Sequence, residues 1–273
     1  MSETSETVDT LAFSLIERAK THSHLPREGS VPISYPEDDA TKISQVEEQH
    51  FWFVARRQWV LTQLKRHCQP GARGIDIGCG SGFTSLWLSQ HGFPTLGTDA
   101  HRIVYKSTPP HLGFLQGDIR AVTPQAEFDF LTLLDVVEHV ADDEMFLRHC
   151  LKFLKPNGIA VITTPAFMWL WSDIDTMSGH FRRYTKTTMQ KIIHPQSAQL
   201  LSQKYFYGSL LLPYLASRMM TRFKSAEKIS QEERLLPPTV NKVFNGLLAL
   251  ENQFSFLGGL PLGTSLFTVI KKN

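Results

Sequence analysis

The sequence has little cysteine, no long hydrophobic run and no excess of charge of either sign. Its three cysteines, an odd number at no metal-ligand spacing, exclude a disulfide framework, give no reason to expect a metal site and favour a reduced, cytoplasmic setting. The longest apolar stretch, residues 205–214, is interrupted by Gly208 and Pro213 and is too short to be a transmembrane segment. The 28 basic and 26 acidic residues leave a net charge of +2 and form no basic stripe, so no nucleic-acid partner is expected.

What the chain does contain is the composition of a globular enzyme. Hydrophobic residues make up 42% of its 273 residues and charged residues 20%, which suffices for a buried core. We expect residues 1–41 to form a loose tail and residues 42–207 to form the core with an N-terminal helix. Residues 208–263 are too long for an ordinary connection and predict a helical cap insertion, which residues 264–273 follow as a final core strand.

Apolar stretches alternate with helical patterns along the core. A helical pattern over residues 45–66 precedes a strand ending at Asp76, and further strands are expected at residues 94–98, 112–116, 128–134 and 159–164. A helix is expected at about residues 142–154, ending in a turn over residues 155–158. Strands alternating with helices of this length predict an α/β fold with a doubly wound parallel sheet. Two later strands are expected at residues 200–207 and 265–271.

The segment from Gly74 to Gly82, G-I-D-I-G-C-G-S-G, is the most informative one. An apolar stretch enters Asp76, and three glycines follow at alternate positions before the next helical pattern. A strand, a glycine-rich turn and a helix start bring bare backbone against a ligand. A dinucleotide fingerprint needs glycine at the sixth position from Gly78, where this chain has Phe83, so a nicotinamide-dependent oxidoreductase is disfavoured.

Three successive strands are expected to end in an acid: Asp76, Asp99 and Asp118. The carboxyl ends of parallel strands are where open α/β sheets bind ligands. A carboxylate after the second strand can accept two hydrogen bonds from a ribose diol. The alternative is that each aspartate only caps the helix that follows its strand.

The D-x-G-x-G-x-G pattern and the three acids resemble class I S-adenosylmethionine (SAM) methyltransferases. The resemblance implies a Rossmann-like, seven-stranded, mostly parallel sheet with an antiparallel last strand. It also implies that the glycine turn holds the methionine part of the cofactor, that Asp99 holds the ribose, and that Asp118 meets the adenine. The cofactor-binding residues expected in this way are Asp76, Gly78, Cys79, Gly80, Gly82, Asp99, Ala100, Asp118, Ile119, Leu134 and Asp135.

An aromatic and basic cluster lies upstream, where related enzymes fold an N-terminal helix over the cofactor. Trp52 and Arg56 are added to the cofactor-binding candidates on this ground, since an arginine can bind a carboxylate in bidentate fashion. The alternative is that aromatic residues at this spacing belong to the core.

The fourth strand is followed by L-D-V-V-E-H-V, residues 134–140. This stretch resembles the D-V-x-E-H-V segment of small-molecule methyltransferases, including the ubiquinone-pathway and type 11 groups. Asp135 and His139 are the catalytic candidates, with His139 as a base because the ordinary pKa of histidine is near neutrality. The alternative is that Glu138 and His139 only brace the helix start.

The stretch G-H-F-R-R-Y-T, residues 179–185, resembles the acceptor-side loop of the same enzymes. The substrate-binding candidates are His180, Arg183, Tyr184 and Trp169. The arginines of this loop could equally be solvated or fix the loop to acidic neighbours.

The sequence therefore predicts a SAM-dependent methyltransferase that acts by in-line displacement on a small-molecule or lipid-like acceptor. A lipid-like acceptor and peripheral membrane contact are suggested by apolar residues near the sixth strand, which could equally pack the cap onto the sheet: Phe206, Leu210, Leu211, Leu212, Tyr214 and Leu215. The nucleophile (oxygen, nitrogen or carbon) and the oligomeric state stay open. The alternative function is a SAM-binding scaffold or sensor without catalysis.

Overall fold

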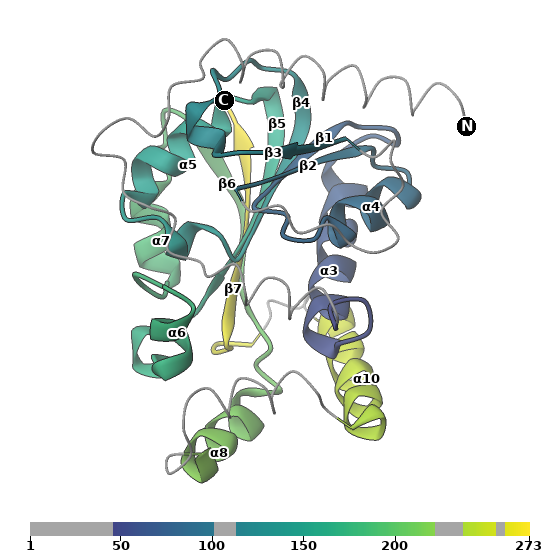
Figure 1. Cartoon of the computed structure of the whole chain (residues 1–273), viewed down its shortest axis with the longest axis vertical. Coiled ribbons are helices and arrows are strands. Elements are labelled where there is room, and N and C mark those ends of the chain that lie inside the picture. Colours follow the sequence, from purple (N-terminus) through teal and green to yellow (C-terminus); the bar gives the residue numbers. More distant parts are fainter. Residues whose placement is uncertain (1–45, 101–112, 222–236, 255–259) are drawn as a thin grey trace.

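A single seven-stranded sheet forms the centre of the molecule, with helices on both faces (Figure 1). The computed structural model of the chain describes residues 46–100, 113–221, 237–254 and 260–273; the expected tail, residues 1–41, lies outside them. The strand order is β3-β2-β1-β4-β5-β7-β6, parallel from β3 to β5, whereas β7 is antiparallel to β5 and to β6. The expected doubly wound sheet with an antiparallel last strand is confirmed.

The strands follow the expected order with small changes of length. They are β1 (Gly74–Ile77), β2 (Thr95–Asp99), β3 (Phe114–Gln116), β4 (Phe128–Leu134), β5 (Leu154–Pro165), β6 (Ala198–Phe206) and β7 (Ser265–Lys272). The turn expected at residues 155–158 lies inside β5, because Leu154 already pairs with Phe128 and the register shifts only afterwards. Six of the seven residues of β4 are buried, as a central strand covered on both faces should be.

The helices are α3 (Phe51–His67), α4 (Phe83–Gln90), α5 (Asp143–Leu151), α6 (Asp173–Met177), α7 (Lys186–Ile192), α8 (Leu211–Thr221) and α10 (Pro238–Phe254). Short 3-10 turns are η1 (Ile119–Ala121), η2 (Val137–His139) and η3 (Met168–Leu170). Helix α3 begins later than residue 45, because the His50 side chain accepts a hydrogen bond from the Trp52 amide and caps the helix.

Helices α8 and α10 stand between β6 and β7 in the chain, where the cap was expected. Both lie beyond the end of the sheet at which β5 finishes and β7 begins (Figure 1). Helix α10 is tied to the start of α3, because the Asn241 side chain accepts a hydrogen bond from the Phe51 amide (2.8 Å). The cap therefore closes over the carboxyl ends of the parallel strands.

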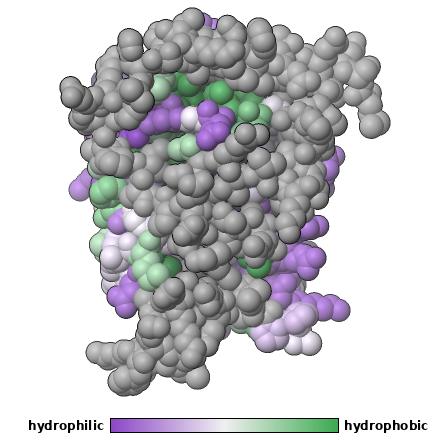
Figure 2. All heavy atoms as spheres, viewed as in Figure 1, coloured by the Kyte–Doolittle hydropathy of each residue, from purple (hydrophilic) through white to green (hydrophobic). Residues whose placement is uncertain are grey.

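Hydrophilic and hydrophobic residues are mixed on the face shown in Figure 2, as on most globular domains. Among the residues that the structure describes, no helix combines the length and the apolar character needed to cross a bilayer.

The glycine turn after β1 offers a matched pair of substitutions. Gly78 and Gly80 are both left-handed (φ 74° and 58°), but a Cβ on Gly78 would lie 2.5 Å from Val136, whereas one on Gly80 would meet nothing within 4 Å. Gly80→Ala should cost only the left-handed strain, about 1–2 kcal/mol. Gly78→Ala should add overpacking, for a total of about 2–5 kcal/mol. Urea unfolding of both variants checks this; equal losses would contradict the close contact with Val136.

Candidate active site

A cavity of about 710 Å³ lies at the carboxyl ends of β1 to β4. Its wall includes the glycine turn after β1 and the ends of the next strands, with Asp99 at the end of β2, Asp118 just after β3 and Leu134 at the end of β4. Ligands of open α/β sheets bind at this edge. The volume is within the usual range for small-molecule sites, about 300–1,000 Å³.

The glycine turn presents bare backbone to the cavity. The amides of Gly78 and Cys79 both donate to the Thr98 carbonyl (2.7 and 3.1 Å), which fixes the turn against β2. Gly78, Cys79 and Gly80 line the cavity. Gly82 lies outside its wall and is the left-handed N-cap of α4 (φ 81°).

Asp99 and Asp118 lie at the wall with different partners. An Asp99 Oδ2 atom accepts a hydrogen bond from the Gly80 amide (2.8 Å), so the carboxylate is oriented by the glycine turn. Asp118 accepts from the Arg120 amide (2.9 Å) and forms an ion pair with its guanidinium (2.6 Å). The helix-capping alternative thus holds for Asp118, which caps η1 and lines the cavity as well. The neighbouring Ala100 and Ile119 also line it.

Asp76 lies behind the wall, although its sequence context matches that of Asp99. Its side chain is buried and accepts hydrogen bonds from the hydroxyls of Ser85 and Thr132, both at 2.7 Å. Burial raises the pKa of this carboxyl above its usual range. The structure gives Asp76 the position of a brace that ties α4 and β4 to β1, so its expected convergence with Asp99 and Asp118 at one surface is corrected.

Arg56 and Asp135 form a partly buried ion pair in the cavity wall. Arg56 Nη1 donates to Asp135 Oδ2 (2.5 Å), and the Thr163 hydroxyl donates to the other oxygen (3.0 Å). Asp135 has a left-handed backbone (φ 59°), a strained conformation for this residue type that its partners hold in place. Trp52 lines the cavity and stacks on Tyr207 with ring centroids 3.9 Å apart.

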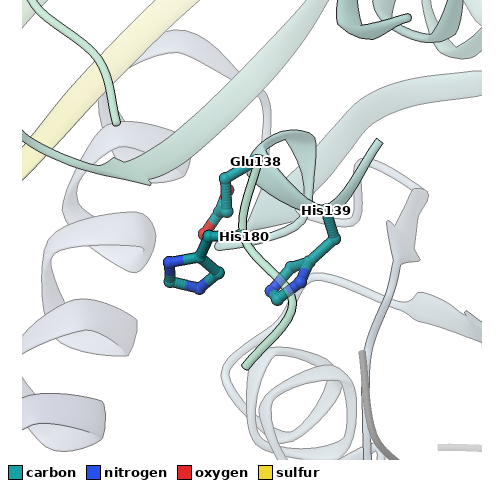
Figure 3. Close-up of side chains that lie close together, drawn as sticks. All are labelled: Glu138, His139 and His180. Carbon is teal, nitrogen blue, oxygen red and sulfur yellow. The ribbon is translucent and has the colours of Figure 1, made fainter. Parts of the chain in front are cut away.

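His139 and His180 lie next to each other in the wall of the cavity (Figure 3). Their ring centroids are 4.7 Å apart in a T-shaped arrangement. Burial, and then the neighbouring His180, lowers the pKa of His139 to about 3, so the expected near-neutral pKa of this imidazole is corrected. The His139 ring is therefore neutral at physiological pH. That it acts as a base stays a prediction.

His180 and Arg183 are held by one buried acid. Asp175 accepts from Arg183 Nε (2.7 Å) and Nη2 (2.9 Å) and from His180 Nδ1 (2.8 Å). Both basic residues line the cavity. Arg182 fixes the loop instead, as the alternative proposed, because it pairs with Asp143 (2.8 Å) and donates to the carbonyls of residues 140 and 141.

Tyr184 and Trp169 lie outside the cavity wall, contrary to the expectation for substrate-binding residues. The Tyr184 side chain is 1% exposed in the core, and its hydroxyl donates to Asp143 (2.7 Å). Trp169, on the short turn η3, is 57% exposed. Tyr184 is therefore packed in the core, whereas Trp169 points to solvent.

Glu47 is a cavity residue that the sequence did not single out. It is 6% exposed and hydrogen-bonds to the Ser81 hydroxyl beside the glycine turn. Burial raises the pKa of Glu47 to about 7. Two adjacent glutamates precede α3, and no pattern tells which of them folds inward.

Glu47 leads to a prediction on pH and stability. Because its carboxyl has a higher pKa in the folded protein than in the unfolded chain, the proton stabilises the fold and this contribution is lost as the pH rises from about 4.5 to about 7. Glu47→Gln should therefore lose less stability than the unaltered protein over that interval. Thermal unfolding of both proteins across the interval measures the difference; parallel curves would contradict a buried, protonated Glu47.

The cap supplies an apolar part of the wall. Leu210, Pro213 and Tyr214 come from α8 and the residue before it, and Val240 and Phe244 come from α10. Val240 and Phe244 belong to an apolar stripe with helical spacing. Such a stripe predicts that one face of the helix is buried, but it does not predict what that face contacts.

A model of a methyltransferase domain family matches residues 48–203. The ubiquinone biosynthesis O-methyltransferase of Bradyrhizobium diazoefficiens is 36% identical over 110 residues, which are 38% of this chain and 44% of the relative. That of Rhizobium etli is 37% identical over 102 residues, 34% of this chain and 41% of the relative. The chain thus spans less than half the length of these curated relatives.

Solved structures share the fold at low sequence identity. A putative sarcosine dimethylglycine methyltransferase from Galdieria sulphuraria matches with a TM-score of 0.54 and 16% identity, covering 80% of this chain and 86% of that one. The cyclase SpnF matches with a TM-score of 0.56 and 14% identity, covering 89% and 98%. At these identities the likeness concerns the fold alone.

Proposed function

The chain belongs to the methyltransferase domain family, of the class I SAM-dependent type, and we propose that it transfers the methyl group of SAM to a hydroxyl oxygen of a small, largely apolar acceptor. Oxygen is chosen as the nucleophile because curated relatives bear the name ubiquinone biosynthesis O-methyltransferase. The name belongs to those proteins and supports the proposal for this chain.

One observation carries the proposal: the two ends of the cavity differ in chemistry. One end has left-handed glycines and the fixed carboxylate of Asp99, which suit the amino acid part and the ribose of SAM. The other end has His139, His180 and the apolar side chains of α8 and α10. A cofactor at the first end would direct its methyl group toward an acceptor at the second.

The chain's own residues would act mainly by alignment and by exclusion of water. Methyl transfer from a sulfonium is an in-line displacement, so a pocket that holds the acceptor oxygen opposite the leaving sulfur lowers the barrier. The Arg56–Asp135 ion pair fixes the end of β4 between the two sites. Apolar residues of the cap limit the access of water to the acceptor side.

An acceptor panel tests this function. The protein is incubated with SAM and either an aromatic diol with an alkyl tail or the matching amine and thiol, and S-adenosylhomocysteine and the methylated product are measured by mass spectrometry. Turnover of the diol above the other two is expected. Cofactor binding without S-adenosylhomocysteine from any acceptor would favour a non-catalytic SAM-binding protein.

A lipid-like acceptor is supported by exposed apolar residues on the cap. Leu212 of α8 and Val243 and Leu250 of α10 are 77%, 66% and 53% exposed, and both helices also line the cavity. Exposed apolar side chains on helices that also line a cavity suit contact with the surface of a bilayer.

This contact predicts binding to lipid vesicles. The protein should float with phosphatidylcholine vesicles in a density gradient, and a double Val243→Glu, Leu250→Glu variant should bind at least about tenfold more weakly, since each side chain contributes about 1.5–3 kcal/mol when buried. Met145→Glu, which alters an exposed apolar residue of α5 (55%), is the matched control and should float normally. An unaltered protein that stays at the bottom of the gradient would contradict membrane contact.

A further inference from the structure

The carboxylate of Glu138 is buried without compensation. Its side chain is 0% exposed, and neither oxygen has a hydrogen bond to another residue within the described parts of the chain. A buried carboxyl group of this kind is costly, and a bound ion, a ligand or a catalytic role is among the usual reasons why a native protein keeps one. Glu138 also lines the cavity, so the group that uses it has access from there.

Two imidazoles lie against this carboxylate. One ligand atom each of Glu138, His139 and His180 can be chosen so that all three lie within 4.8 Å of one another. Figure 3 shows Glu138 and His139 reaching from the η2 turn and His180 from the loop after α6. A backbone hydrogen bond holds the two segments together, from the Phe181 amide to the Glu138 carbonyl (2.8 Å).

The surroundings hold the two rings in fixed orientations. His180 Nδ1 donates to Asp175 Oδ1 (2.8 Å), which leaves Nε2 as the nitrogen with a lone pair. Asp175 is in turn fixed by Arg183 Nε (2.7 Å). Metal-binding histidines almost always have such a carboxylate behind them. The His139 ring hydrogen-bonds to the backbone of residues 178 and 179, a second common support for a metal-binding imidazole.

We propose that Glu138, His139 and His180 bind one divalent transition-metal ion at the acceptor end of the cavity, although no metal site was expected from the cysteine spacing. Two imidazoles and one carboxylate on one side of an ion suit Zn²⁺, Fe²⁺ or Mn²⁺ and leave coordination positions open. Mg²⁺ and Ca²⁺ are disfavoured, because they prefer an all-oxygen set.

The open positions give the ion a role that rests on the proposed function. Coordination of the acceptor's hydroxyl oxygen lowers the pKa of that hydroxyl. Its O–H bond breaks and the proton passes to solvent. An electron pair on the oxygen then forms the O–C bond to the methyl carbon as the C–S bond breaks, and the sulfur leaves as a neutral thioether. In this scheme Glu138, His139 and His180 hold the ion and do not exchange protons, so the ion takes the place of His139 as the group that activates the acceptor.

Metal titration tests the site without any methyl transfer. The untagged full chain is treated with EDTA, dialysed and titrated with ZnCl₂ by calorimetry, without SAM or acceptor. One saturable site is expected, with binding weakened at least about tenfold by Glu138→Gln and by His180→Ala, since even residues that only support metal ligands contribute about 10–100-fold. His194→Ala is the matched control and should bind as the unaltered protein does, because His194 forms a surface pair with Glu144 (2.8 Å).

Two further readouts decide the remaining outcomes. SAM affinity and thermal unfolding show that each variant is folded; His180→Ala serves if Glu138→Gln does not fold. Co²⁺ in place of Zn²⁺ should give visible absorption bands that both variants lose.

Absence of a saturable site, or binding unchanged in both variants, would overturn the metal site even if the protein methylates a diol. Full turnover of the diol in EDTA would overturn the role of the ion, and inactivity toward every acceptor would leave a measured metal site standing.

Discussion

Replacing Asp99 with alanine is expected to weaken SAM binding by at least about tenfold, and by more if both ribose hydroxyls donate to the carboxylate. Each such charge-assisted hydrogen bond contributes about 1.5–3 kcal/mol, and every 1.4 kcal/mol is about a factor of ten in affinity. The carboxylate is already oriented by a hydrogen bond from the Gly80 amide (2.8 Å). Little of the free energy of SAM binding is therefore spent on ordering the Asp99 side chain. Calorimetric titration with SAM measures the change.

A control for this variant exists at the opposite end of the sheet. Asp129 also pairs with a neighbour, accepting from Lys155 Nζ (2.6 Å), but it lies at the start of β4 and outside the cavity wall. Asp129→Ala should leave SAM affinity unchanged. Urea unfolding should show that Asp99→Ala loses only about 1 kcal/mol, the usual contribution of one backbone hydrogen bond. Equal SAM affinity in the Asp99 variant and the unaltered protein would remove Asp99 from the site.

Replacing Asp175 with alanine is expected to cause the largest loss of stability, about 3–5 kcal/mol. The substitution leaves the Arg183 guanidinium, 9% exposed as a residue, without its carboxylate, and an unpaired buried charge has a cost of this size. Asp175→Asn should lose less, because the amide oxygen still accepts. Asp173→Ala, in the same turn of α6 but on an exposed side chain, should change stability by less than about 0.5 kcal/mol.

Acid should expose the same interaction. Burial alone would raise the pKa of Asp175, but hydrogen bonds and charge from His180 and Arg183 hold it well below its ordinary value of 3.8. A carboxyl with a lowered pKa contributes stability that is present above its unfolded pKa and is lost as the pH falls below it. The unaltered protein should therefore lose stability more steeply below about pH 4 than Asp175→Asn. Identical acid unfolding of the two would contradict the account of this ion pair.

The sheet could be predicted from the sequence because local patterns determine it. Apolar strands, the glycine turn and the acids at the ends of β2 and β3 are each written within a few neighbouring residues. The comparison of Asp76 with Asp99 shows the limit of such patterns. Asp99 is the last residue of β2, whereas β1 continues for one residue after Asp76. In the register of the two strands Asp76 pairs with Gly97, so Asp99 lies two residues closer to the cavity. Asp76 stays between the hydroxyls of Ser85 and Thr132 instead.

The acceptor side depends on contacts between distant segments and is harder to predict. Tyr184 resembles a substrate residue in the sequence, yet its hydroxyl pairs with Asp143, 41 residues away. Glu138 and His180 are likewise brought together only by the packing of the loop after α6 against η2. A sequence lists the residue types of such a cluster, but only the fold shows that they meet.

We expect SAM to bind at the carboxyl ends of β1 to β4 with its methyl group directed toward the cap. A crystal structure with S-adenosylhomocysteine tests it most directly. The ribose hydroxyls should lie within hydrogen-bond distance of Asp99, and the sulfur should lie on the side of Glu138, His139 and His180. Product bound elsewhere, or with its sulfur directed away from those three residues, would contradict it.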